Sequence, residues 1–110
     1  GTLILGAPGG SRIISMVLLA ILNYQAQAPV DLQALVSAPR YHHQYLPDRL
    51  EVEPDAFPGA VLDELQLTGH VLRVSEQKWG NMQAVWIERA SGKAYAASDP
   101  RGMGSGLAWY

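Results

Sequence analysis

Apolar and polar positions follow one another in short blocks along the chain, and these blocks predict strands and helices. The apolar run at 3–5 ends at Gly6 and indicates a short strand. A turn rich in glycine and proline follows at 6–10, and Ser11 then occupies the position of a helix N-cap. The pattern therefore predicts a strand, a tight turn and a helix over 12–26.

The predicted helix over 12–26 is apolar around its whole circumference rather than along one stripe. A helix of this kind is normally buried on every side. A chain of 110 residues has few other elements with which to surround it. The pattern favours a larger domain, in which additional polypeptide covers this helix.

The rest of the chain predicts short helices and strands in turn. Asp31 is a suitable N-cap for a helix through Val36, which has to end before Pro39. Residues 40–48 are polar and aromatic and are expected to be irregular or extended. No linker divides the chain, so we predict one unit. The remaining predicted elements are a strand at 50–53, a helix from Pro58 to Leu67 capped by Gly69, a strand at 71–74, and a hairpin of strands 82–88 and 93–97.

Composition narrows the class of protein. Hydrophobic residues make up 48% of the chain and charged residues 16%, which excludes a disordered chain. With 8 Lys and Arg against 10 Asp and Glu, the chain lacks the basic surface of a nucleic-acid binder. The absence of cysteine excludes disulfides and thiol catalysis. No apolar run reaches the roughly 20 residues of a membrane helix, and Gly1 in place of Met indicates a processed or excised chain.

The strongest candidate site in the sequence is the glycine pair Gly9 and Gly10. The order strand, glycine turn, helix presents backbone N–H groups at a helix N-terminus, where the dipole favours an anion. A phosphate loop is one interpretation, but the lysine of that motif is missing after Gly10, and no dinucleotide fingerprint occurs. An oxyanion hole also needs aimed backbone donors. The residues alone leave open whether this is an anion site or, more commonly, a purely structural turn.

Histidine and acidic clusters are assigned structural roles. Adjacent His42 and His43 point to opposite faces of an extended chain, so they do not readily share a metal ion. Asp48 and His70 lie at no spacing that requires a shared site. The acidic residues at 48–55 lack the spacing of a calcium loop, and we expect a solvated strand face and turn. These acidic residues are Asp48, Glu51, Glu53 and Asp55.

The polar turn around Asp99 and the tryptophans are also expected to be structural. An Asp before Pro commonly starts a turn and bonds its own backbone. Asp99 is expected to form an ion pair with Arg101 or with Arg40. The tryptophans, at irregular spacing, are expected in the core or at an interface; they are Trp79, Trp86 and Trp109.

Several motifs together resemble one family, the γ-glutamyltransferases or γ-glutamyltranspeptidases. Residues 6–14, GAPGGSRII, resemble the family's G-[ST]-P-G-G-S-R-I stretch. Residues 38–48, APRYHHQYLPD, are similar to its A-P-R-[FY]-H-H-Q-[WF]-x-P-[DN] segment, and residues 97–101, ASDPR, to its A-[SA]-D-P-R. Tyr110 is similar to its closing Tyr. The similarity covers nearly the whole chain in one order. Residues 80–83 and 102–106 depart from the family pattern and leave the substrate preference open.

The resemblance implies an α/β chain of the layered α+β kind. It would be part of an N-terminal-nucleophile hydrolase αββα sandwich with antiparallel sheets. Members of the family are precursors that cleave themselves into a large and a small subunit. The new N-terminal Thr is the nucleophile and is activated by its own amine. It takes the γ-glutamyl group from glutathione or a related amide, and water, an amino acid or a peptide accepts it. The resemblance implies no cofactor and no metal.

By the resemblance, residues 1–110 are the C-terminal segment of a small subunit, incomplete as a domain. Gly9 and Gly10 match the glycine pair whose N–H groups form the oxyanion hole. The nucleophile lies outside this chain, so the chain alone is expected to be inactive. Residues expected to support the site structurally are Ser11, Arg12, Arg40, Asp99 and Arg101.

The expected partners are the large subunit, the rest of the small subunit, a γ-glutamyl donor and an acceptor. No nucleic acid and no transmembrane segment are expected. Family members are mostly periplasmic, secreted or on the outer cell surface, which sets the expected location. The alternatives are a glutaryl or cephalosporin-type acylase of the same family and a non-catalytic structural or interaction domain.

Overall fold

The structure is a computed structural model of the chain and describes all residues except 28, 105 and 107–110. Its contacts separate into two compact units. The first contains Gly1–Ala38 and Gly80–Tyr110, and the second contains Pro39–Trp79. The prediction of one undivided unit is therefore wrong. The second unit is an insertion with a small sheet of its own. No change of composition marks its boundaries in the sequence.

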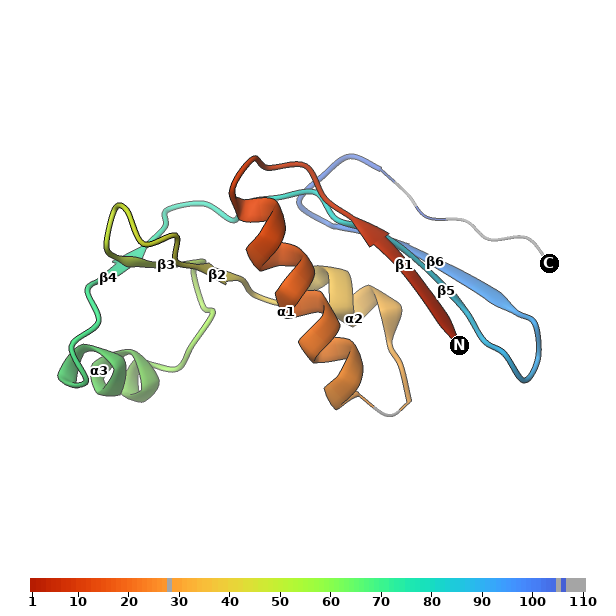
Figure 1. The fold of residues 1–110 in the computed structure, drawn as a ribbon, viewed down its shortest axis with the longest axis horizontal. Coiled ribbons are helices and arrows are strands. Elements are labelled where there is room, and N and C mark those ends of the chain that lie inside the picture. The colour runs from red at the N-terminus through yellow and green to blue at the C-terminus, as the bar shows by residue number, and fades with distance from the viewer. Residues whose placement is uncertain (28, 105, 107–110) are drawn as a thin grey trace. The chain divides into compact units, whose positions relative to one another are not determined.

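The first unit is a three-stranded sheet with two helices (Figure 1). The strand order is β1-β5-β6, and both pairs are antiparallel, with Ile4 opposite Val85 and Val85 opposite Ala96. The central strand β5 thus joins a strand from the start of the chain to one near its end. The elements are β1 (Thr2–Gly6), α1 (Arg12–Ala26), α2 (Leu32–Ser37), β5 (Gln83–Ile87) and β6 (Ala94–Ser98).

The core of the first unit lies between this sheet and the two helices. α2 contacts β5 and β6, whereas α1 contacts β1 and α2. Ala84 and Ala97, which are opposite each other in register, are almost fully buried, and their small side chains let α2 approach the sheet. The buried apolar residues of this unit are Met16, Ala20, Leu32, Leu35, Val36, Met82, Ala84 and Ala97.

The second unit has a smaller sheet of mixed direction. The strand order is β2-β3-β4; β2 pairs antiparallel with β3, and β3 pairs parallel with β4. The parallel pair arises because α3 carries the chain back before β4 begins. The antiparallel sheet that the resemblance implies is thus found in the first unit, and the second adds one parallel pair. Its elements are β2 (Tyr41–His42), β3 (Leu50–Val52), α3 (Gly59–Leu67) and β4 (Leu72–Val74).

The local helix signals are largely confirmed. α1 has the predicted bounds, and Asp31 caps α2 by accepting a hydrogen bond from the Ala34 N–H at 3.0 Å. Ser11 stands at the N-cap of α1 but makes no capping hydrogen bond there, since its backbone is already helical. Pro58 is the N-cap of α3 rather than a residue of its first turn.

The described chain does not bury α1 on every side. Its buried residues are Met16 and Ala20. Ile14, Leu18 and Leu22 are 76%, 53% and 48% exposed, and their spacing of four residues places them along one stripe. Additional covering polypeptide stays a prediction, and this stripe is the surface it would cover. Among the described residues, no helix combines the length and apolar character needed to cross a membrane.

Candidate functional site

The loop between β1 and α1 has a backbone shape that depends on glycine. Gly9 has a φ of +148° and Gly10 a φ of +60°, conformations that other residues rarely adopt. The Gly9 carbonyl accepts a hydrogen bond from the Arg12 N–H at 3.2 Å, and the Gly10 carbonyl accepts one from the Ile13 N–H at 3.2 Å. The first turn of α1 therefore holds both carbonyl groups of the glycine pair.

The N–H groups of the same two glycines are free to bind a ligand. Both residues are exposed. Among the hydrogen bonds between residues that the structure describes, none uses the N–H of Gly9 or Gly10 as a donor. These groups lie just before the positive end of the α1 dipole. The loop therefore presents two backbone donors where negative charge is favoured, which suits an anion or a developing oxyanion.

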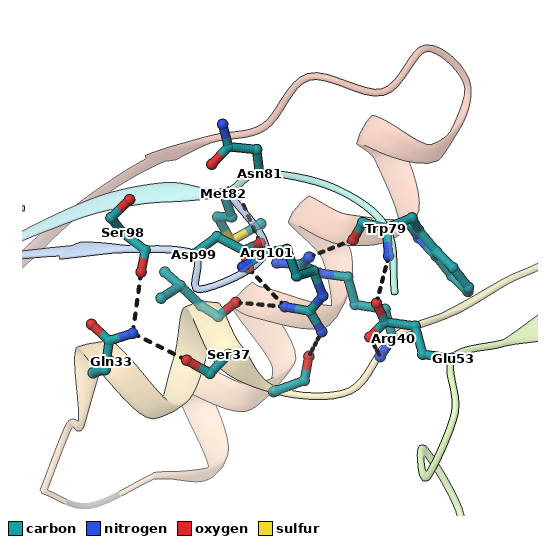
Figure 2. A network of polar contacts seen from close by, with 12 residues as sticks. Gln33, Ser37, Arg40, Glu53, Trp79, Asn81, Met82, Ser98, Asp99 and Arg101 are labelled. Atoms are coloured by element: carbon teal, nitrogen blue, oxygen red, sulfur yellow. Dashed lines mark hydrogen bonds and ion pairs between the residues drawn. The ribbon is translucent and has the colours of Figure 1, made fainter. Parts of the chain in front are cut away.

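A second polar arrangement is centred on Asp99, at the end of β6 (Figure 2). Its carboxylate is fully buried and accepts hydrogen bonds from the Met82 N–H at 3.0 Å and the Arg101 N–H at 3.0 Å. The Arg101 guanidinium completes the group through an ion pair of 2.9 Å. Of the two expected ion pairs of Asp99, the one with Arg101 is confirmed.

Arg101 and the end of β6 also hold α2 in place. The Arg101 guanidinium donates hydrogen bonds to the Val36 carbonyl at 3.2 Å and to the Ala38 carbonyl at 3.1 Å. These carbonyls lie at the C-terminal end of α2, where helical carbonyls lack intrahelical partners. The Gln33 amide of α2 donates to the Ser98 carbonyl at 3.1 Å. The segment ASDPR and the residue before it in β6 therefore connect the end of β6 to α2.

Within the second unit, Glu53 joins the two ends of the segment. Its carboxylate accepts hydrogen bonds from the Arg40 N–H at 2.7 Å and from the Trp79 N–H at 2.8 Å. The Arg40 guanidinium donates to the Trp79 carbonyl at 2.8 Å. Figure 2 shows these contacts. Arg40 and Trp79 lie where the chain enters and leaves the second unit, and we call them its stem residues. The predicted solvated acidic face is therefore wrong for Glu53, which is 0% exposed. β3 ends at Val52, so Glu53 leaves the strand alternation and turns to the backbone of both stems.

The two adjacent histidines have separate partners. The Nε2 atom of His42, which is buried, lies 2.8 Å from Gln44 Oε1. The Nε2 atom of His43 lies 3.1 Å from Asp48 Oδ1. Each histidine thus has a hydrogen-bonding partner of its own within the second unit, and a structural role for both stays a prediction. In the described part of the chain, no group of three or more His, Cys, Asp or Glu is arranged to hold a metal ion.

The tryptophans can be placed only in part. Trp86 lies on β5 with its ring 5.5 Å from that of Tyr95, and its indole N–H donates to the Tyr24 hydroxyl at 3.2 Å. This confirms a packing role for Trp86, between the sheet and α1. The backbone of Trp79 belongs to the Glu53 arrangement. Trp109 and the closing Tyr110 lie outside the described residues.

Two residues that shape these sites, Glu53 and Met16, carry no distinctive signal in the sequence. Glu53 carries the same alternating signal as its neighbour Glu51, whose side chain is 14% exposed and forms an ion pair with Arg49, so no local pattern distinguishes the two. Met16 is 1% exposed and packs against the glycine loop. The sequence does not single out Met16 as the residue that contacts Gly9, because the helix around it is apolar on all sides. The only available signal for Met16 is its position one turn after Arg12, on the side of the helix start.

Comparison with known proteins identifies the class and then the family. The structure of gamma-glutamyltranspeptidase from Pseudomonas nitroreducens matches with a TM-score of 0.84 and 36% identity, over 99% of this chain and 56% of that chain. The layers described above are therefore part of the N-terminal-nucleophile hydrolase fold. The gamma-glutamyltranspeptidase family model matches residues 1–109. The chain belongs to the gamma-glutamyltranspeptidase family, which confirms the resemblance seen in its motifs.

The curated relatives are much longer than this chain. The glutathione hydrolase proenzyme of Pseudomonas aeruginosa is 40% identical over 110 residues, which are 96% of this chain and 19% of that protein. The glutathione hydrolase proenzyme of Escherichia coli is 37% identical over 108 residues, which are 98% of this chain and 18% of that protein. The 110 residues thus span less than a fifth of the length of these two relatives.

Proposed function

We propose that residues 1–110 are the C-terminal segment of the small subunit of an enzyme that transfers or hydrolyses γ-glutamyl groups. In this proposal the backbone N–H groups of Gly9 and Gly10 form the oxyanion hole. One observation carries the proposal. The carbonyls of Gly9 and Gly10 accept hydrogen bonds from the first turn of α1, whereas the N–H groups of both residues donate none among the described residues. Family membership supports the assignment of these donors to acyl transfer rather than to phosphate binding.

The geometry suits a reaction in which negative charge forms on a carbonyl oxygen. A threonine hydroxyl outside these residues attacks the γ-carbonyl carbon of the donor, and the carbonyl oxygen becomes an oxyanion. Both glycine N–H groups donate to that oxygen. The hydroxyl proton passes through the threonine's own amine to the nitrogen of the donor, the C–N bond breaks, and the amine departs to leave an acyl-enzyme. Water or an amine attacks the acyl-enzyme through a second oxyanion at the same place. Loss of one such donor typically lowers the rate by about 10²–10³-fold.

The proposal requires further polypeptide, namely the rest of the small subunit and a large subunit. The name proenzyme, carried by the two curated relatives, agrees with a self-cleaving precursor. The further polypeptide would pack on the exposed apolar stripe of α1, which consists of Ile14, Leu18 and Leu22. We place the complete enzyme in the periplasm or outside the cell, as the family resemblance implies. Cell fractionation of the complete protein tests this location.

A chimera provides the test of activity. Residues 1–110 replace the matching segment of the Escherichia coli relative, and release of the anilide from a γ-glutamyl anilide is measured. We expect steady turnover by the chimera and none by the 110-residue chain alone, because that chain lacks the nucleophile. Turnover by the isolated chain comparable to the chimera contradicts the proposal. A folded and processed chimera without turnover indicates a non-catalytic domain, and a higher kcat/KM for glutaryl amides indicates an acylase.

Substitution of Gly9 tests the oxyanion role directly. Proline at position 9 removes the N–H and cannot adopt a φ of +148°. Gly9→Pro in the chimera is expected to lower kcat by at least about 10²-fold, as for loss of an oxyanion donor. Cleavage of the precursor, followed by gel electrophoresis, shows separately whether the variant has folded and matured. Unchanged kcat in the mature variant contradicts the role of Gly9.

A further inference from the structure

The side chain of Met16 lies against the glycine loop. It takes no part in the proposed reaction. Met16 lies in α1 one turn after Arg12 and is 1% exposed. A methyl group placed on Gly9 in the Cβ position would lie 2.8 Å from Met16 Cε. The Cα of Gly9 therefore rests close to the end of the Met16 side chain, and a larger residue at position 9 would have to displace it.

Three contacts together define the position of Gly9. Its carbonyl is held by the Arg12 N–H, and the next carbonyl is held by the Ile13 N–H. Both bonds fix the loop relative to the axis of α1. The bond to the Gly9 carbonyl also fixes the peptide plane that carries the Gly10 N–H, because both groups belong to the same peptide. Neither bond holds the preceding peptide plane, which carries the Gly9 N–H and turns about the φ bond of Gly9, a residue without a side chain to restrict it. Outside its chain neighbours, the atom nearest to the Cβ position of Gly9 is Met16 Cε at 2.8 Å, and the next is Arg12 Cβ at 3.9 Å.

We infer that Met16 is a positioning residue for the oxyanion hole. It sets the place of Gly9 so that the N–H groups of the pair point to one oxygen. This inference rests on the proposed function of the glycine pair. The effect is expected on the chemical step, because a misplacement of about 1 Å can lower a catalytic rate by about 10²-fold. A long unbranched thioether suits this role because it fills an irregular gap under a bent loop.

The test compares three variants of the active chimera. Met16→Ala removes the contact, Met16→Leu keeps most of its volume, and Leu35→Ala makes a similar loss in the core of the same unit. Leu35 is 2% exposed and lies on α2, which contacts the sheet. Each mature variant is assayed for kcat and KM with a γ-glutamyl anilide, and its thermal unfolding is followed in parallel.

We expect kcat of Met16→Ala to fall by about 10–100-fold with KM within about twofold, because the oxyanion exists only along the reaction path. Met16→Leu should restore kcat to within about threefold, because volume-conserving substitutions are tolerated best. Leu35→Ala should lower the unfolding temperature by a similar amount and leave kcat within about twofold. An equal fall of kcat in Met16→Ala and Leu35→Ala overturns the inference, because it shows a general loss of stability.

A double-mutant cycle tests the contact itself. Gly9→Ala adds the methyl group that meets Met16 Cε, so its effect on kcat should be smaller in the Met16→Ala background than in the parent. Additive effects of the two substitutions contradict a direct contact. The proposed role of Met16 and the proposed function of the glycine pair can fail separately. If Gly9→Pro retains activity, the oxyanion role is wrong; if Gly9→Pro loses activity and Met16→Ala retains it, only the role of Met16 is wrong.

Discussion

At the scale of single residues, the site depends on backbone conformation more than on side-chain chemistry. In the proposed oxyanion hole Gly9 and Gly10 act through their N–H groups, while the first turn of α1 holds their carbonyls. What glycine contributes is a φ that other residues reach only with strain. The two positions differ, however. Gly9 is also restricted by Met16, whereas Gly10 has open space around the position of a Cβ.

Gly10→Ala separates backbone strain from function. Gly92, in the turn between β5 and β6, also has open space and a positive φ, +71° against +60° at Gly10. Alanine at either position should cost about 1–2 kcal/mol of stability through the same strain. Only Gly10→Ala should also lower kcat, by about tenfold or more, because a relaxed φ moves the donor from the oxyanion. Unfolding and steady-state assays of both chimeras check this, and equal kcat values contradict it.

At the scale of elements, buried charged groups connect pieces of chain that the sheets leave separate. In the first unit, Asp99 and Arg101 connect the end of β6 to the last carbonyls of α2. In the second, Glu53 accepts the N–H groups of both stem residues, Arg40 and Trp79. The carboxylates of Asp99 and Glu53 each accept hydrogen bonds from the backbone N–H groups of two residues. Removing one of their partners leaves a buried polar group without compensation.

Glu53→Gln tests the closure of the second unit. Glutamine keeps one acceptor oxygen, so its amide faces one of the two stem N–H groups. We expect a loss of about 2 kcal/mol or more, the typical cost of an unsatisfied buried donor and a lost charge-assisted bond. The same change at Glu64, which is exposed on α3, should cost less than about 0.5 kcal/mol. Limited proteolysis reports it: cleavage within 39–79 should accelerate in Glu53→Gln alone, and equal rates contradict the assignment.

Asp99→Asn tests the connection between β6 and α2. The substitution leaves the buried Arg101 guanidinium without its counter-charge, while the shape of the side chain is kept. Breaking a buried pair in this way typically costs about 3–5 kcal/mol. Denaturant unfolding of the chimera measures the loss. Asp63→Asn, on the exposed face of α3, is the matched control and should have almost no effect. A small effect at Asp99 would show that Arg101 is held well enough by the α2 carbonyls.

At the scale of the whole molecule, the chain forms a well-formed sheet and still exposes apolar surface on α1. The described chain buries Met16 and Ala20 of α1 but leaves Ile14 and Leu18 largely exposed. The curated relatives have more than four-fifths of their length outside the matched region. In the proposed enzyme, part of that length covers this stripe.

Leu18→Glu tests whether the stripe is covered. In the 110-residue chain the position is 53% exposed, so a charge there should change stability little. In the chimera, the same charge would be buried, and the yield of folded, mature enzyme should fall severely. Leu67→Glu, on a residue of α3 that is 88% exposed, is the control for an added charge on a helix. Size-exclusion chromatography and precursor cleavage report the result, and normal maturation of Leu18→Glu contradicts the covering.

The sequence predicted the local elements well because their signals are local. The glycine turn, Asp31 and Pro58 mark helix starts, and the motifs identified the family. The pairing of β1 with β5 and the division into two units depend on contacts between distant parts of the chain, which no local pattern shows. Glu53 illustrates the limit at one residue: whether it faces solvent or the stems is decided by where β3 ends, one residue earlier.

The order of the sheet β1-β5-β6 has a consequence for synthesis. β1 is made before its partner β5, which begins only at Gln83, after the whole second unit. At about 5–20 residues per second, the ribosome takes several seconds to produce that partner. During this interval the edge of β1 that pairs with β5 lacks that partner, and an unpaired strand edge is the condition under which strands associate wrongly. The insertion of the second unit therefore sets a waiting time for the strand that leads into Gly9 and Gly10.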